Sequence, residues 1–291
     1  MAKPVGVTAR KIELGLRLRV LREASALTLA EAVVGMRSLS ETKLQRIEKG
    51  RATFRYVADL RKLADGYGAS MDVVEELVDL HKDASSQDWL TQFRSSLNAP
   101  MQAFAGIEGE ARALRMYHPV LVPGILQTED YARGLFEEVR TIDGRTTSYI
   151  DTHVKLRTRR KEESILRPDD PVRAWVVIRE SALLRPVGSI EVMHGQYDEI
   201  GRLAALENIR IQILPMKAWA IQFPYDFTVL DLGHTLPATV QTDTAWGALS
   251  MSDKPSEITR FMEIFQAMTA SALPPEHTPA LMQRLAREIE Q

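Results

Sequence analysis

Polar and cationic side chains gather along the stretch from residue 37 to residue 51. Within it, Leu44 and Ile47 are three residues apart, which is the spacing of one buried stripe on a helix. The other face of that helix would carry short polar groups and long cations, the side chains that reach base edges and phosphates in a major groove. The candidate DNA-contacting residues are Arg37, Ser40, Glu41, Thr42, Lys43, Gln45, Arg46, Lys49 and Arg51.

Two short helices joined by a turn would hold this surface. Thr28 is a suitable N-cap, and Glu31 three residues later completes a capping box for a first helix that ends near Gly35. Ser40 caps the second helix, and Gly50 ends it. An ordinary solvated helical hairpin would show the same amphipathic pattern, so the pattern alone leaves that alternative open.

Apolar stripes on both sides of this pair predict three more helices. A leucine stripe marks a helix over residues 11–24, and further stripes mark helices over residues 56–66 and 72–80. Together with the central pair they predict an all-α domain of five helices that ends near residue 81.

Charge is divided unevenly along the 291 residues. Residues 1–62 contain 14 Lys and Arg against 6 Asp and Glu, a formal charge of +8, whereas the remainder contains 23 against 33, a charge of −10. A basic front end on an acidic body suits a nucleic-acid-binding module joined to a domain that does not bind DNA. The length itself favours two domains.

Cysteine is absent from the chain, which excludes disulfides and thiolate metal sites. No stretch approaches the ~18 uninterrupted apolar residues of a membrane span, and the first residues contain no apolar core of signal-peptide length. We therefore expect a cytoplasmic protein that does not interact with a membrane.

Strand signals appear only in the second half of the chain. The predicted strands are β-branched runs at residues 172–178, 209–214, 227–232 and 238–242. Helices are expected before, between and after them, including one near the start of this region, where Ile107, Ala111 and Leu114 have helical spacing. The predicted class is therefore α+β, with a five-helix domain followed by a larger mixed α/β domain.

Three regions follow from these elements. Residues 1–81 form the five-helix domain, and residues 101–291 are numerous enough to bury a core of their own. Residues 82–100 between them are polar and Ser-rich but contain Trp89 and Phe93, so they predict a linker that docks through a few aromatic side chains.

The sequence SETKLQRIEKG, from Ser40 to Gly50, resembles the signature of phage-repressor-like helix-turn-helix domains, the XRE or Cro/CI-like family. The resemblance implies a lambda-repressor-like DNA-binding fold in which Arg46 and its neighbours meet DNA. It also implies that Glu48 tethers the following loop inside the domain. The turn from Val34 to Ser38 is about one residue longer than the family's usual turn.

Three segments of the remaining chain resemble the C-terminal domain called DUF5753 or the Scr1 family, which follows such modules in mycelial, antibiotic-producing bacteria. They lie at residues 108–133, 180–189 and 208–215. The resemblance implies a transcriptional regulator of development or secondary metabolism. Such regulators are often described as antitoxin-like and are often paired with a small DUF397-like protein.

Catalytic motifs are missing from the sequence. There is no H-E-x-x-H, G-x-S-x-G, P-loop or G-x-G-x-x-G, and no carboxylate stands at ligand spacing from a histidine. The scattered histidines of the second domain are His118, His153, His194, His234 and His277. We expect no enzymatic activity, no metal and no cofactor.

The Pro123-Gly124 break is the candidate site for an unknown small-molecule ligand. Polar side chains beside an apolar bend can line a pocket, and the candidate ligand-binding residues around it are Arg115, Tyr117, Gln127 and Tyr131. The alternative is that these residues simply tie two helices and the loop together.

A predicted helix over residues 148–166 is strongly basic. Its Arg157, Arg159 and Arg160 are candidates to touch DNA outside the helix pair. A solvated basic face on an otherwise acidic domain is the favoured interpretation.

The leading hypothesis is a sequence-specific regulator that binds double-stranded DNA as a homodimer and reads two half-sites. The alternative is an antitoxin-like module that binds a small partner protein, with DNA binding serving autoregulation. The dimer interface is expected in the second domain, on the helix over residues 255–272, unless its apolar stripe is buried within its own domain. That stripe consists of Ile258, Phe261, Met262, Phe265 and Met268.

Overall fold

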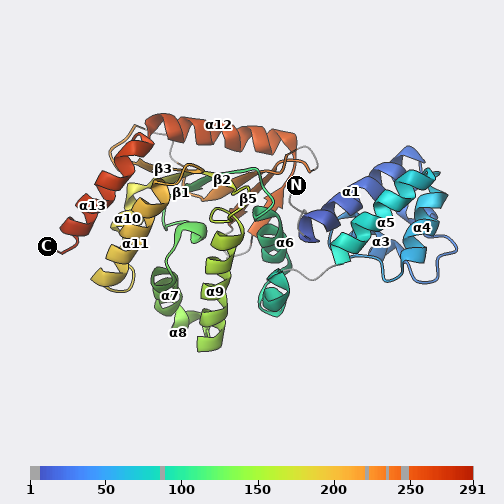
Figure 1. Cartoon of the computed structure of the whole chain (residues 1–291), viewed down its shortest axis with the longest axis horizontal. Coiled ribbons are helices and arrows are strands. Elements are labelled where there is room, and N and C mark those ends of the chain that lie inside the picture. Colours follow the sequence, from blue (N-terminus) through green and yellow to red (C-terminus); the bar gives the residue numbers. More distant parts are fainter. Residues whose placement is uncertain (1–6, 86–88, 220–222, 234–235, 244–248, 291) are drawn as a thin grey trace. The chain divides into compact units, whose positions relative to one another are not determined.

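The computed structural model describes residues 7–85, 89–219, 223–233, 236–243 and 249–290. The chain divides into two compact units, the first ending at Gln92 and the second beginning at Phe93 (Figure 1). Each unit has its own hydrophobic core. A 3-10 helix, η1 (Trp89–Ser96), crosses the boundary between them.

The described part of the first unit contains the five predicted helices. They are α1 (Val7–Ala24), α2 (Leu29–Ala32), α3 (Glu41–Glu48), α4 (Val57–Gly66) and α5 (Met71–Ser85). Leucines of α1, α3, α4 and α5 meet in one core and are fully buried, with Ile47 of α3 among them. The all-α prediction for the first domain is therefore confirmed.

Helix α1 approaches the end of α3 closely at Gly15. A Cβ atom at this position would lie 2.3 Å from the carbonyl oxygen of Ile47 and 2.7 Å from that of Glu48. Backbone atoms cannot move away as the tip of a side chain can. Glycine is therefore required where α1 supports α3.

Gly15→Ala should destabilise the first unit by about 1–3 kcal/mol, because the overpacked methyl group outweighs the better helix propensity of alanine. Urea unfolding of the full chain, followed by far-UV circular dichroism, measures this. Gly66→Ala in α4 is the matched control, because its Cβ would meet nothing within 4 Å. Equal stability of the two variants would contradict the close approach.

The second unit is built on a mixed six-stranded sheet in the part of the chain that is described. Its order is β3-β2-β1-β4-β5-β6, with β1, β2 and β3 parallel and the other neighbours antiparallel. The strands are β1 (Ala113–His118), β2 (Arg173–Arg179), β3 (Ile209–Leu214), β4 (Phe227–Asp231), β5 (Thr239–Asp243) and β6 (Leu249–Ser252). The predicted α+β class is confirmed.

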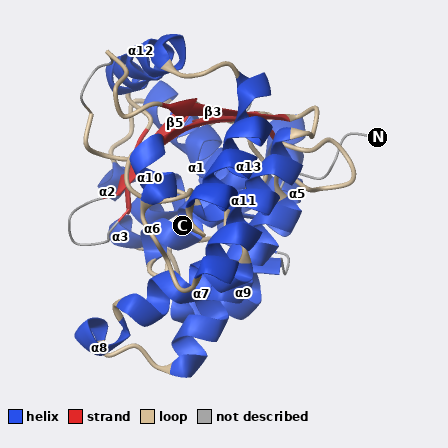
Figure 2. Ribbon diagram, turned by 90° about the vertical axis from the view of Figure 1, so that its left-hand side faces the viewer, coloured by secondary structure: helices blue, strands red, loops and turns tan. Residues whose placement is uncertain are grey.

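Helices cover both faces of this sheet. Helix α12 (Pro255–Ser271) lies on one face, and α6 (Ala99–Glu108), α7 (Glu129–Glu138), α9 (Thr147–Glu163) and α11 (Ile190–Ala204) lie on the other (Figures 1 and 2). Helix α13 (Thr278–Glu288) packs against α11. The remaining elements are η2 (Gly124–Leu126), α8 (Arg140–Asp143), α10 (Glu180–Leu184) and η3 (Pro275–His277).

The predicted helix through Ile107, Ala111 and Leu114 is wrong. Helix α6 ends at Glu108, and Leu114 lies in strand β1. The strand has the sequence ALRMYH, which contains no β-branched residue, so its composition gave no strand signal. The helical spacing of the three apolar residues arose by coincidence where a helix is followed closely by a strand.

The apolar stripe of α12 belongs to the core of its own domain. Phe265 and Met268 are fully buried, and Ile258, Phe261 and Met262 pack against the same cluster of sheet residues. Burial within the domain thus holds fully for Phe265 and Met268 and in part for the three half-buried residues, and the location of a dimer interface stays a prediction.

Candidate nucleic-acid interface

Local hydrogen bonds fix the two helices of the predicted pair. The Thr28 hydroxyl accepts from the backbone N–H of Glu31 at 3.2 Å, and the Glu31 carboxylate accepts from the N–H of Thr28 at 2.8 Å. The Ser40 hydroxyl accepts from the N–H of Lys43 at 3.2 Å. Gly50 follows α3 with φ of +65°. The predicted caps and the predicted stop are confirmed.

Helix α4 holds the turn between α2 and α3. The Lys62 ammonium donates to the carbonyl of Gly35 at 2.9 Å, and the Ser38 hydroxyl donates to the Asp59 carboxylate at 2.5 Å. Gly35 has φ of +74°, a conformation that favours glycine. The longer turn is thus anchored at both ends and presents Arg37 to solvent.

The structure places the predicted DNA-contacting side chains on one exposed surface. Leu44 and Ile47 are fully buried under α3, so the opposite side of the helix faces solvent. Lys43 is the exception, because it is half-buried and its ammonium lies 3.4 Å from the carbonyl of Ser38. The exposed members of the set are Arg37, Ser40, Glu41, Thr42, Gln45, Arg46, Lys49 and Arg51.

The cations of this surface differ from other cations of the same unit because they form no ion pairs in the described part of the chain. Within the described residues, no ion pair or side-chain hydrogen bond is formed by Arg37, Arg46, Lys49, Arg51 or Arg55. By contrast, Arg17 on α1 pairs with Glu76 at 2.9 Å, and Arg19 pairs with Glu23 at 2.7 Å. The unneutralised positive charge is therefore concentrated around α3, where it can attract a polyanion.

Among the described residues, Arg55, between α3 and α4, is a further unpaired cation that was not predicted. It is exposed, and its guanidinium carbon lies 5.3 Å from the centre of the exposed Tyr56 ring. A basic residue next to an aromatic one, shortly after the helix, was the available sequence signal. Counting charges could not have shown which cations remain unpaired.

Glu48 ties α3 to α1 through a nearly buried ion pair. The Arg22 guanidinium donates to both Glu48 oxygens, at 2.7 Å and 2.9 Å, and also to the carbonyl of Leu27 at 2.8 Å. Burial, together with the Glu48 charge, raises the pKa of the adjacent Tyr67 hydroxyl. The expectation that Glu48 tethers the following loop is wrong, since its partner Arg22 lies on α1.

Two family models match the chain. Residues 13–77 match a model described as Helix-turn-helix domain, and residues 101–284 match one described as Domain of unknown function (DUF5753). The second match spans more than half of the 291 residues. The chain belongs to the DUF5753 family. No curated protein and no solved structure matches it.

The two matches confirm both resemblances found in the sequence. The helix-turn-helix match contains α2 and α3 with the exposed cationic surface, and this makes the chain a DNA-binding regulator in general terms. The DUF5753 match begins in α6 and ends inside α13. Across the described residues, no helix combines the length and apolar character needed to span a membrane.

In the DUF5753 domain, the four predicted ligand-binding residues do not form one site. Tyr117 is fully buried on the α12 face of the sheet, packed with Phe265. Arg115 lies two residues earlier on the same strand and so shares that face. Gln127 directly follows η2 and Tyr131 belongs to α7, which lies on the opposite face. The predicted grouping is therefore wrong, because it joined residues from two sides of a sheet.

The bend after Pro123 is held by buried amides. The Gln127 side chain donates to the carbonyl of Val122 at 2.8 Å. Gln196 of α11 donates to the carbonyl of Leu126 and accepts from the N–H of Thr128, both at 2.9 Å. For Gln127, the alternative interpretation that it ties the loop to its neighbours is confirmed.

Helix α9 is not a solvated basic face. Arg160 is buried and donates to both oxygens of Glu108, each at 2.7 Å. Lys161 is also buried and pairs with Glu199 at 2.7 Å. Lys155 and Arg159 are the exposed members of the basic run, and Arg159 pairs with Glu162 at 3.0 Å. Two cations of the run, Arg160 and Lys161, therefore stabilise the domain from within.

His118 lies beside a pair of carboxyl groups in the DUF5753 domain. Its Nδ1 is 3.8 Å from Asp226, and burial lowers the pKa of His118 to about 4. Burial and the neighbouring Asp226 raise the pKa of Asp243 to about 6. Among the described residues, no three His, Cys, Asp or Glu side chains are placed to hold a metal ion. His234, another of the scattered histidines, lies outside those residues.

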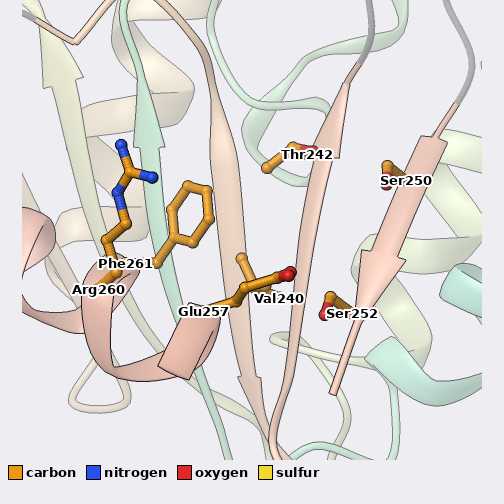
Figure 3. A pocket seen from close by; sticks show the side chains of 7 residues that line it. All are labelled: Val240, Thr242, Ser250, Ser252, Glu257, Arg260 and Phe261. Carbon is orange, nitrogen blue, oxygen red and sulfur yellow. The ribbon is translucent and has the colours of Figure 1, made fainter. Parts of the chain in front are cut away.

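A hollow of about 330 Å³ opens between β5, β6 and α12 (Figure 3). Its polar groups are three hydroxyls from the strands, together with Glu257 and Arg260 from the helix. Hydrogen bonds from Ser252 and Lys254 hold the pKa of Glu257 below its usual value. The described lining of the hollow therefore offers hydroxyl, carboxylate and guanidinium groups that can hydrogen-bond a ligand.

Proposed function

We propose that this DUF5753-family protein is a transcriptional regulator that binds a specific double-stranded DNA sequence through the exposed face of α3. The proposal rests chiefly on the unpaired cations around α3, compared with paired cations elsewhere in the unit. Arg46 and Gln45 are the side chains on α3 whose chemistry suits guanine and adenine edges. Development or secondary metabolism is the proposed setting, the cytoplasm the proposed location, and binding without catalysis the proposed mode of action.

Arg46→Ala should weaken binding of the full chain to a duplex selected from random sequences by about 1–3 kcal/mol. The reason is the loss of a bidentate contact to a base edge. Fluorescence anisotropy at several salt concentrations measures the change. A phosphate-only role would instead weaken all duplexes alike and flatten the salt dependence.

Arg19→Ala is the matched control for this experiment. Arg19 is exposed but already paired with Glu23 on α1, so its removal changes the net charge by the same amount. Binding of this variant should stay close to that of the unchanged protein. Equal losses in both variants would show that only net charge matters, and unchanged binding of Arg46→Ala would remove that residue from the interface.

A homodimer reading two half-sites is part of the same proposal. One helix-turn-helix unit buries only about 600–1,000 Å² on DNA, which is little for tight specific binding. Half-sites about one helical turn apart would double that area. Light scattering of the full chain should report a dimer, and a monomer both free and on DNA would contradict the two-half-site arrangement.

A second candidate function is an antitoxin-like interaction with a small protein of the DUF397 kind. The segment between β3 and β4 favours a protein partner, because Trp219 is fully exposed and Tyr225 is 61% exposed. Exposed aromatic side chains are costly to leave in water and often act as binding anchors. Purification from native extract should yield a small protein in equal amount, and Trp219→Ala should lose it.

A further inference from the structure

Arg157 of α9 is a half-buried cation without a counter-charge. Its guanidinium carbon lies 4.4 Å from the centre of the Phe136 ring, and its Nε is fully buried and has no hydrogen-bond partner. No carboxylate of the described residues lies within ion-pair distance of it, and Asp243 acts on it only from farther away. Buried charges in proteins are normally paired, so this one lacks an expected partner.

The two arginines described around Arg157 already have partners. Arg160 donates to both oxygens of Glu108 at 2.7 Å. Arg145, whose guanidinium carbon is 5.2 Å from the same Phe136 ring, is paired with Asp143. Each of these positive charges is thus balanced by one carboxylate. The single charge of Arg157 is the one left over in this neighbourhood.

The missing partner does not come from the nearby histidine. Burial, together with the charges of Arg157 and Arg145, lowers the pKa of His153 to about 4. His153 is therefore neutral at pH 7 and adds no second positive charge, and because an imidazole is either neutral or cationic it cannot supply the missing negative charge in either state. The same surroundings, with Arg160 close by, lower the pKa of Arg157 to about 10, which is the expected response of a cation that lacks an anion.

Gly124 itself places no side chain beside the guanidinium groups of Arg157, which is half-buried, and Arg160, which is buried. A Cβ atom at Gly124 would lie 3.5 Å from Nε of Arg157 and 3.7 Å from Nη1 of Arg160. Any larger residue would place its side chain beside these nitrogens. Because Gly124 does not have a positive φ, its backbone conformation does not demand glycine. The observed consequence of glycine at this position is therefore that its backbone lies close to the two arginines.

We propose that Arg157 binds an oxyanion, the phosphate or carboxylate group of a small molecule, beside the Gly124 bend of the DUF5753 domain. A guanidinium fork is suited to two parallel hydrogen bonds with either group. The Phe136 ring packs against the guanidinium. His153, being neutral, does not attract the anion away from Arg157. The Pro123-Gly124 break is thus part of a ligand site, with Arg157 in place of Arg115 and Tyr117. This proposal is independent of DNA binding.

Arginine footprinting of the full-length protein tests the site directly. Phenylglyoxal modifies accessible guanidines, and mass spectrometry of peptides reports the rate at each arginine. Inorganic phosphate and malonate, at equal ionic strength, are the two probes. The protecting anion should slow modification of Arg157 roughly tenfold at about ten times its Kd, because few sites then stay empty. Phosphate protection alone identifies a phosphate site, and malonate protection alone a carboxylate site.

Arg159 is the internal control, because it is exposed on the same helix and already paired with Glu162. Its modification rate should be unaffected by either anion. In calorimetric titrations, Arg157→Gln should bind one anion fewer per chain than the unchanged protein, whereas Arg159→Gln should keep full stoichiometry. Arg157 modified at the same rate with and without both anions would overturn the proposal, and this readout needs no variant to fold.

Discussion

Glu108→Gln is expected to destabilise the DUF5753 domain by about 3–5 kcal/mol, which is the usual cost of removing one partner of a buried ion pair. Glu108 is 1% exposed, and Arg160 would keep its charge in the same interior without a carboxylate. Urea unfolding of the full chain, followed by far-UV circular dichroism, should show the unfolding transition of this domain at a markedly lower urea concentration.

The matched control is Glu162→Gln on the solvent-exposed side of α9. Glu162 pairs with Arg159 at 3.0 Å, and both side chains are more than 40% exposed. Such surface pairs contribute about 0–1 kcal/mol. A loss for Glu108→Gln no greater than for this control would mean that water reaches Arg160 and that the pair is not structurally important.

Glu48→Gln is expected to destabilise the helix-turn-helix unit by about 3 kcal/mol for the same physical reason. The Glu48 side chain is 5% exposed and that of Arg22 is 11% exposed, so the remaining guanidinium would stay largely out of water. Because Arg22 also holds the carbonyl of Leu27, the turn before α2 should loosen as well. Hydrogen exchange of the full chain should show faster exchange at α2 and at the end of α1.

An exposed pair on α1 provides the comparison for that variant. Arg19 and Glu23 are 58% and 51% exposed, so Glu23→Gln should reduce stability far less than Glu48→Gln does. DNA binding of Glu48→Gln is a second measurement. Because Glu48 lies on the buried side of α3 and cannot contact a duplex directly, any change in binding would be indirect. Unchanged exchange at α2 in Glu48→Gln would refute the role of the ion pair in positioning the turn.

The helix-turn-helix unit could be predicted closely because its signals are local. Thr28 and Glu31 are three residues apart, and so are Ser40 and Lys43, whose backbone N–H donates to the Ser40 hydroxyl. Such hydrogen bonds depend on sequence neighbours alone. The exposed face of α3 followed from the spacing of its two buried residues. Its lack of neutralising partners could not be predicted, because ion pairs elsewhere join residues such as Arg17 and Glu76 that are far apart in sequence.

Longer-range relations account for what the sequence did not reveal in the DUF5753 domain. Arg160 and Glu108 are 52 residues apart, so a run of basic residues looked solvated although it is partly buried. Strand β1 lacked β-branched residues, and without that strand the two faces of the sheet could not be distinguished. Arg115 and Gln127 were therefore grouped, although a sheet separates them.

The outward side chains of α3 make almost no interactions within their own domain. Among the residues that the structure describes, Glu41, Thr42, Gln45, Arg46 and Lys49 make no side-chain hydrogen bond or ion pair. Stability of the unit instead depends on the opposite side of the helix and on the clamp from α4. Under the proposed function, duplicated genes could thus acquire new operator preferences by changing these five positions, without compensating mutations in the fold. The same property makes α3 a suitable place to exchange recognition residues between related regulators.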